Sequence, residues 1–369
     1  MAASTVDIPA SPGNSIFLSA DGCGTISNRH HSSQEGGKIM KRFMFALILL
    51  CLIVGVVAAA PKTKVKIALI VESTVDDKGW CQAMHDAIIA VQKKYGTALV
   101  EYSYSEKMKP VDAGSAARQY VAKGFDIIIC HGAQYKNLVL EMAEEFPKTT
   151  FAFGTSGEIG PKNVFTYMPE SEETGYVNGI IAGLVTKSNI IGLVGPVDGG
   201  DAARYNRGFI LGVRAVNAKA NVQVAYTGSF GDFVKAAELA HTQIKAGADV
   251  LTGSAQQALG ALRAVAEYKD KPIWWLGQDT AQLTIPESYK VIAAASYAYE
   301  AVVEQLIDKR QAGVLGGEVL PLNFANGGFI YKFNDKVGPV LTADIRKAAE
   351  KALADITANK ITIPWKDVK

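Results

Sequence analysis

The sequence predicts an α/β protein with two doubly wound parallel-sheet lobes, joined by a hinge that the chain crosses more than once. Short apolar runs such as Val65–Val71 alternate with amphipathic stretches from Lys62 onward, which is typical of strands buried on both faces of a parallel sheet. The alternation breaks near residues 168–172 and restarts, which indicates two lobes of about 100 residues each. The later elements are too few for a third domain and are expected to return to both lobes.

In the first lobe, strands and helices follow one another with short connections. The helix Trp80–Lys94 has one apolar face, and the helix Ala113–Lys123 ends at Gly124, where a C-terminal glycine belongs. The other elements expected here are strands at Ala98–Tyr104, Asp126–Cys130, Thr150–Phe153 and Val164–Tyr167, and a helix at Leu138–Phe146 that Pro147 stops.

The second lobe repeats the pattern after Pro169. Helices are expected at Glu173–Thr186, Ala202–Val216, Phe233–Ala246 and Ala258–Tyr268, and strands at Ile190–Val194, Val222–Thr227, Val250–Gly253 and Ile273–Leu276. The tail adds strands at Val291–Ala295 and Phe329–Phe333 and helices at Ala298–Arg310 and Ala343–Ala358. We therefore expect lobe 1 at 61–168 plus about 294–323, and lobe 2 at 169–293 plus about 324–369.

A leader is predicted ahead of the first strand. Phe43–Ala60 carries no charge and follows Lys41 and Arg42, which is the pattern of a secretory signal peptide over 40–60. The alternative is an uncleaved membrane anchor, because about 18 residues just span a bilayer. Residues 1–39 are rich in Ser and Gly, and we interpret them as a disordered tail or as the product of a misassigned start, with Met40 as the true one.

Composition excludes several classes of protein. The formal net charge is +2, so no strongly basic surface indicates nucleic-acid binding. The hydrophobic fraction of 49% excludes global disorder. The four cysteines, Cys23, Cys51, Cys81 and Cys130, form no C-x-x-C pair, so neither a disulfide framework nor a thiolate zinc site is expected.

Aromatic, amide and acidic residues follow the predicted strands at their carboxyl ends, where open α/β sheets bind ligands. We predict eight ligand-binding residues: Asp77, Trp80, His131 and Gln134 in lobe 1, and Phe230, Gln257, Gln278 and Asp279 in lobe 2. The aromatics can stack on a flat ring, worth about 1–3 kcal/mol per base, and the polar groups can bind its edge. Structural roles compete with this interpretation, because Asp77 suits a helix N-cap and His131 a buried core position.

No catalytic motif accompanies these residues. Gly154–Gly157 and Gly195–Gly200 follow strands, but neither is a G-x-G-x-x-G motif. The sequence contains no Walker motif, no G-x-S-x-G elbow and no H-E-x-x-H pair. A binding protein without catalytic residues, cofactor or metal is therefore the economical prediction.

A series of short motifs runs through the chain in a recognisable order. They are Asp77-Lys-Gly-Trp80, Glu173-Thr-Gly175-Tyr-x-x-Gly179, Ile191-Gly192-x-Val194-Gly195, Gly208-Phe209-x-x-Gly212, Gly228-Ser229-Phe230-x-Asp232 and Gly277-x-Asp279. With these motifs, the region from about Val65 to Phe333 resembles the basic membrane protein family of type I periplasmic binding proteins, the purine-nucleoside receptors of ABC importers. The resemblance implies that a purine lies between Trp80 and Phe230, and that Asp279 holds the ribose hydroxyls.

Three departures from the family pattern widen the expected ligand class. Cys81 replaces the usual Asn of the first loop, Gln278 stands where an apolar residue is common, and Ala293–Tyr299 lacks a lysine often found there. The ligand could therefore be a nucleoside, a free nucleobase or another flat heterocycle.

The resemblance implies an exported, monomeric solute receptor that closes on its ligand and delivers it to an ABC permease, on the periplasmic or extracellular face of the membrane. One alternative is a sensor for a different heterocycle such as a flavin. The other is an enzyme that acts on nucleosides. A repressor-like module is disfavoured, because a hydrophobic segment stands where a DNA-binding helix-turn-helix would precede the first strand.

Overall fold

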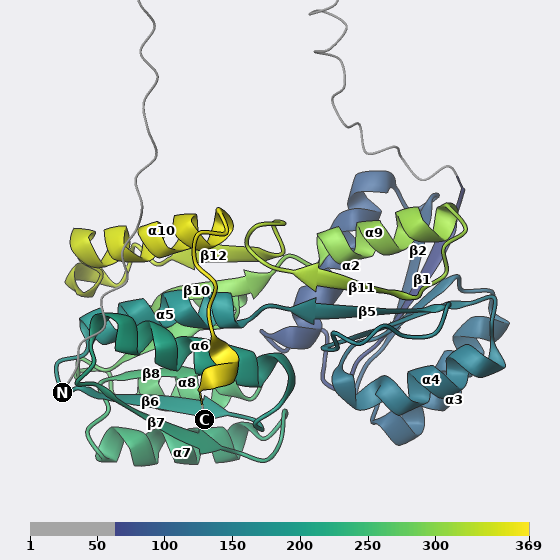
Figure 1. The fold of residues 1–369 in the computed structure, drawn as a ribbon. Helices are drawn as coiled ribbons and strands as arrows, with labels where there is room; N and C mark the ends of the chain where they lie inside the picture. Colours follow the sequence, from purple (N-terminus) through teal and green to yellow (C-terminus); the bar gives the residue numbers. More distant parts are fainter. Residues whose placement is uncertain (1–62, 369) are drawn as a thin grey trace, which may run out of the picture. The chain divides into compact units, whose positions relative to one another are not determined.

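Lobe 1 is a six-stranded parallel sheet in a computed structural model of the chain, which describes residues 63–368. Its strands are β1 (Val65–Ile70), β2 (Val100–Ser105), β3 (Ile127–Cys130), β4 (Thr150–Gly154), β5 (Val164–Pro169) and β11 (Glu318–Leu322). They pair in the order β11-β5-β4-β3-β1-β2. Helices α2 (Trp80–Tyr95) and α9 (Glu300–Gln311) cover one face, and α3 (Pro110–Ala122) and α4 (Lys136–Glu145) cover the other (Figure 1).

Lobe 2 repeats this plan with one antiparallel edge strand. Its strands are β6 (Ile190–Gly195), β7 (Asn221–Tyr226), β8 (Val250–Gly253), β9 (Trp274–Gly277), β10 (Val291–Tyr297) and β12 (Phe329–Phe333), in the order β12-β10-β9-β8-β6-β7. Only β12 runs antiparallel to its neighbour among these described strands. Helices α5 (Glu172–Val185), α6 (Gly200–Val216) and α10 (Ala343–Thr357) lie on one face, and α7 (Phe233–Lys245) and α8 (Ala258–Glu267) on the other.

Burial on both sheet faces explains why the strands are continuous apolar runs. In β1, Val65, Ile67 and Leu69 pack into the core under α2 and α9. Ala68 and Ile70 point to the opposite core under α3 and α4. Because successive side chains of a strand alternate between faces, a strand with a core on each side has few positions left for polar residues, such as Lys66 near the start of β1.

The chain passes between the lobes three times, as the sequence predicted for a multi-crossing hinge. The crossings follow β5, β10 and β11, so that α9 and β11 return to lobe 1 and β12 and α10 return to lobe 2. Strand β10 stays in the lobe 2 sheet up to Tyr297, past the expected return at about residue 294. The fold class predicted from the sequence is thereby confirmed.

One strand was not predicted from the sequence, and two predicted segments lie outside the described residues. Strand β11 (Glu318–Leu322) is a short edge strand that contains Pro321, and proline is tolerated only at such edges. The predicted leader at 40–60 and the segment 1–39 lie outside the described residues. Within 63–368, no helix is both long and apolar enough to cross a membrane.

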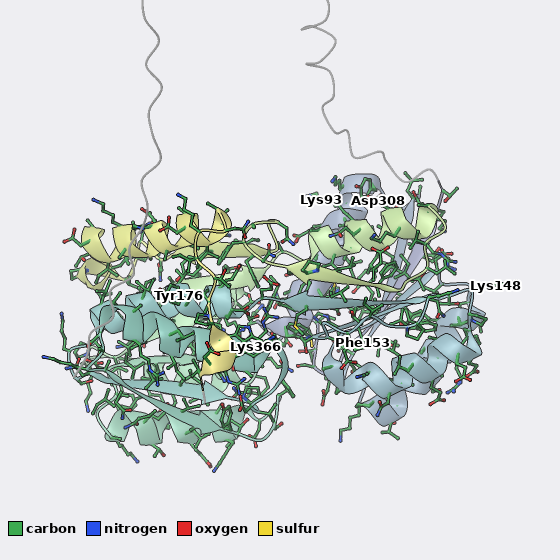
Figure 2. All side chains as sticks on the ribbon, viewed as in Figure 1. Lys93, Lys148, Phe153, Tyr176, Asp308 and Lys366 are labelled. Carbon is green, nitrogen blue, oxygen red and sulfur yellow. The ribbon has the colours of Figure 1, made fainter. Side chains whose placement is uncertain are left out.

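The C-terminal segment folds back over lobe 2. After α10 the chain forms a short 3₁₀ helix at Trp365–Asp367 that packs on α6, and Lys366, labelled in Figure 2, marks its position. The guanidinium of Arg204 lies 5.0 Å from the centre of the Trp365 ring. The last part of the chain therefore contacts the helix that begins at the cleft.

Candidate functional site

A cavity of about 340 Å³ lies between the two lobes. Its walls come from segments that directly follow strands: the β1, β3 and β4 ends in lobe 1, and the β6, β7 and β8 ends in lobe 2. The lining residues are Trp80, Gly132, Ala133, Gln134 and Thr155 from lobe 1, and Val197, Gly199, Gly200, Asp201, Phe230, Ala255 and Gln256 from lobe 2. This is the location at which open α/β sheets bind ligands, and the volume lies within the usual range for ligand pockets.

Trp80 forms a rigid aromatic wall at the first turn of α2. Its indole stacks on the His131 ring with centroids 4.4 Å apart and planes 12° apart. The two residues also exchange hydrogen bonds: Trp80 Nε1 donates to the His131 carbonyl (3.2 Å), and His131 Nε2 donates to the Trp80 carbonyl (3.0 Å). The rings of Tyr297 and Tyr299 stand nearly perpendicular to the indole. Trp80 is therefore held in one orientation before any ligand enters.

His131 is a neutral support for Trp80 and does not border the cavity. The ring is fully buried, and burial lowers the pKa of His131 to about 3. A carbonyl oxygen can only accept, so Nε2 carries the proton, and Nδ1 accepts from the Tyr167 hydroxyl at 2.5 Å. The sequence-predicted His131 thus lies directly behind the aromatic wall.

Phe230 provides the opposite aromatic wall from the loop between β7 and α7. Gly228, with φ +79, lets the chain turn after the strand. Downstream, the Asp232 carboxylate caps α7 by accepting from Lys235 N at 2.8 Å. The Phe230 carbonyl accepts from Gln257 N at 3.1 Å, which ties this loop to the start of α8. Gln134, the third sequence-predicted residue that lines the cavity, donates to Glu72 at 2.8 Å.

Three of the predicted residues are buried around the cavity without lining it. Asp77 accepts hydrogen bonds from the backbone N–H groups of Gly79, Cys81 and Gln82, so its carboxylate organises the loop before α2. Gln257 donates to the Val194 and Ser254 carbonyls. Gln278 accepts from Ala255 N and donates to the Tyr297 hydroxyl, both at 2.9 Å.

Asp279 is a buried acid on the lobe 2 side with one unused oxygen. Its Oδ1 accepts from Ala281 N at 2.7 Å, which caps the 3₁₀ helix Thr280–Leu283. Its Oδ2 is buried and makes no hydrogen bond of good geometry among the described residues, and the nearby Ser296 hydroxyl lowers the pKa of the carboxyl slightly. Burial raises the pKa of Asp279 to about 8, and the nearby negative charge of Asp77 acts in the same direction. Asp279 does not line the cavity itself.

Asp201 lines the cavity and was not predicted from the sequence. It stands in the first turn of α6, and its Oδ2 accepts a hydrogen bond from the Tyr297 hydroxyl at 2.8 Å. Burial raises its pKa, while the Tyr297 hydrogen bond and nearby backbone N–H groups partly offset that rise. The only sequence signal was an acid after Gly199-Gly200, which a first-turn helix position explains equally well.

The lobes approach each other closely at two glycines beside the cavity. A Cβ on Gly79 of lobe 1 would lie 3.2 Å from Gln256 Cα of lobe 2. A Cβ on Gly200 of lobe 2, where φ is +59, would lie 3.0 Å from Thr155 Oγ1 of lobe 1. The cavity is therefore nearly closed at both points, and the absence of side chains there permits it.

The cleft cavity differs from the other depressions of the surface. Grooves of about 900 and 510 Å³ run along α3, but both are lined by lobe 1 alone. Between residues 63 and 368, no group of three or more His, Cys, Asp or Glu side chains is placed to hold a metal ion. Cys81 and Cys130 are free and buried.

Comparisons with known proteins agree with this architecture. A family model described as "ABC transporter substrate-binding protein PnrA-like" matches residues 64–364. The nucleoside-binding protein BmpA of an ABC transporter of Lactococcus lactis is 26% identical over 327 residues, covering 83% of this chain and 90% of that protein. A purine-binding protein of Brucella abortus is 27% identical over 225 residues, covering 60% of this chain and 62% of that protein.

Two further comparisons concern a relative described as binding a sugar and a solved structure. A putative glucose-binding protein of an ABC transporter of Haloferax volcanii is 30% identical over 205 residues, covering 56% of this chain and 51% of that protein. The solved structure of a solute-binding protein of an ABC transporter system from Conexibacter woesei superposes with a TM-score of 0.66 at 22% identity, covering 81% of this chain and 98% of that chain. The structural match supports the two-lobed fold.

Proposed function

The chain belongs to the Bmp family of PnrA-like substrate-binding proteins of ABC transporters, and we propose that it binds a purine nucleoside or the related free base in the cleft. Members of this family bind a small molecule outside the cytoplasm for an ABC permease. We further propose that this chain is exported and monomeric, and that it acts without catalysis.

One observation carries the purine proposal. Trp80 of lobe 1 and Phe230 of lobe 2 border the same cavity. Two rings on opposite walls suit a flat ligand, because each base–aromatic stack is worth about 1–3 kcal/mol. Gln134, Gln256 and Thr155 add amide and hydroxyl groups that can hydrogen-bond the edge of such a ring.

Asp279 is the residue we assign to the sugar; because it lies outside the cavity lining, the assignment requires the sugar to extend beyond the cavity described above. Its buried Oδ2 has no partner among the described residues, and an unpaired buried oxygen gains most from a hydroxyl donor. The other buried residues, Asp77, His131, Gln257 and Gln278, act in this proposal by holding the loops that carry the wall. Two relatives described as binding a nucleoside and a purine support the ligand class.

Ligand exchange would follow a hinge motion of the lobes. Three chain crossings join the lobes, and the closest contacts between them flank the cavity at Gly79 and Gly200. Opening at these contacts would expose the cavity, and closing would bury the ring between Trp80 and Phe230. The proposal predicts that a side chain at either glycine weakens binding by holding the lobes apart.

The test is identification of the ligand followed by titration. Small molecules released by denaturing freshly purified protein are identified by mass spectrometry, and guanosine, inosine, adenosine, guanine, riboflavin and glucose are titrated by calorimetry. We expect binding of at least one purine and none of glucose. Binding of riboflavin or glucose in place of every purine would overturn the proposal. Chromatographic detection of nucleoside turnover would overturn the non-catalytic part.

A further inference from the structure

The described lining of the cavity contains an acidic side chain but no basic one. Among the described residues that line the cavity, Asp201 alone has an ionisable side chain, and it is acidic. The nearest cation on the same helix, Arg204, is paired with Glu172 through both Nε and Nη2 and lies over the Trp365 ring. The cavity therefore offers a ligand a carboxylate that no lysine or arginine of its lining neutralises.

Asp201 is held in place by a chain of hydrogen bonds that links two parts of the wall. Tyr297 donates to Asp201 Oδ2 at 2.8 Å and accepts from Gln278 Nε2 at 2.9 Å. Gln278 Oε1 then accepts from the N–H of Ala255, which lines the cavity with a φ of 61. A non-glycine residue in this region is strained and marks sites where the surroundings fix the backbone. The carboxylate and the strained loop are thus positioned together.

The direction of the hydrogen bonds in this series determines which ligand groups Asp201 can bind. Tyr297 has one hydroxyl hydrogen and gives it to Asp201. A carboxylate has about four acceptor positions, so Asp201 retains acceptor capacity for a ligand beside Tyr297 and the nearby backbone N–H groups of Asp201 and Ala202. A half-buried carboxylate with unused acceptors favours N–H or O–H groups, and it disfavours a ring atom with a lone pair or a phosphate.

We infer that Asp201 is a specificity-determining residue that accepts hydrogen bonds from two adjacent N–H groups on the edge of the ligand ring, as on the N1 and 2-amino edge of guanine. The inference rests on the proposed function, because it assumes a purine stacked between Trp80 and Phe230. A ring without these donors would leave the carboxylate unpaired, and sites built to bind a polar group reject analogues that lack it.

The experiment compares guanosine with inosine, which lacks only the 2-amino group. Calorimetry at pH 7 is carried out on the wild-type protein, Asp201→Asn and the control Asp198→Asn. Asp198 belongs to the same β6–α6 segment, is exposed, and pairs with Arg207 outside the cavity. We expect wild type and Asp198→Asn to bind guanosine at least tenfold more tightly than inosine. Asp201→Asn should lose at least tenfold in guanosine affinity and most of this preference.

The outcomes distinguish a failure of the role proposed for Asp201 from a failure of the proposed purine-binding function. If wild type binds purines but shows no preference for guanosine, or if Asp201→Asn keeps the preference, the role of Asp201 is wrong and the proposed function stands. If wild type binds no purine, the proposed function itself is wrong. Thermal melting checks the fold of the isosteric Asp201→Asn variant. Should it unfold, Tyr297→Phe replaces it, with an expected loss of several-fold in guanosine affinity, and unchanged affinity would overturn the inference.

Discussion

The two walls of the cavity are built in opposite ways. In lobe 1, Trp80 is stacked on His131, bonded to it in both directions, and flanked by Tyr297 and Tyr299. In lobe 2, Phe230 belongs to a loop between Gly228 and Gly231, and no aromatic ring among the described residues packs against it. An aromatic wall supported by other rings thus faces one without such support.

This difference has a thermodynamic meaning. Ordering a side chain on binding costs about 0.5–1.5 kcal/mol of conformational free energy. The contacts around Trp80 already order its side chain in the folded protein, so ligand binding does not incur this cost. Phe230 lacks such ring contacts, so we expect part of its stacking energy to be offset by the cost of ordering its side chain. The first wall should therefore contribute more to affinity than the second.

Replacing Trp80 should have the largest effect. Trp80→Ala removes the preformed platform, and we expect guanosine affinity to fall by about tenfold to a hundredfold, or 1.4–2.7 kcal/mol. The ligand-induced change in tryptophan fluorescence should disappear with it. Trp80→Phe keeps an aromatic surface and serves as the control, with a loss of only a few-fold. Unchanged affinity in Trp80→Ala would remove this residue from the site.

Replacing Phe230 should have a smaller effect on affinity. In Phe230→Ala the loop loses a stacking ring but also the need to order it, so we expect a loss of about threefold to tenfold by calorimetry. Val234→Ala is a suitable control, because Val234 is 72% exposed in the same region. A loss as large as that of Trp80→Ala would show that the two walls are equivalent.

The buried acids of the two lobes also differ in how fully their oxygens are hydrogen-bonded, and this difference can be tested through the pH dependence of stability. Asp77 of lobe 1 is satisfied by three backbone N–H groups, whereas Asp279 of lobe 2 has a buried oxygen without a described partner. The pKa of Asp279 is raised to about 8 from 3.8. Between about pH 4 and 8 the folded state holds a proton that the unfolded state has released, so stability decreases as pH rises through this window.

Asp279→Asn should remove this contribution. In the absence of ligand, we expect the free energy of unfolding of the variant to fall less steeply between pH 5 and 8 than that of wild type, by at most about 1.4 kcal/mol per pH unit. Urea denaturation at several pH values measures it, and Asp198→Asn controls for the loss of an exposed carboxylate. Parallel pH profiles for wild type and Asp279→Asn would contradict the assignment.

Most of the fold could be predicted from the sequence because strands buried on both faces are recognisable as continuous apolar runs. Runs such as Ile127–Cys130 have no polar position, and each helix between them has one apolar face. Strand β11 escaped prediction because an edge strand packs less fully and can include Pro321. Its pairing with β5, which is far away in sequence, depends on the chain returning to lobe 1.

The site was less predictable than the fold. Residues directly after strands, such as Trp80 and Phe230, were placed at the cleft by topology alone. The support of Trp80 by His131 depends on a contact between residues 51 positions apart, which no local pattern records. Asp201 lies beyond two glycines, and only the hydrogen bond from Tyr297 distinguishes it from an ordinary first-turn acid.

The three crossings also set the order in which the chain can finish folding during synthesis. Lobe 1 needs α9 and β11, which are made after most of lobe 2, and lobe 2 needs β12 and α10, which are made last of all. At about 5–20 residues per second, the nascent sheet of lobe 1 would wait roughly 8 to 30 seconds with its β5 edge unpaired. Neither lobe can be produced intact by truncating the chain at a single point.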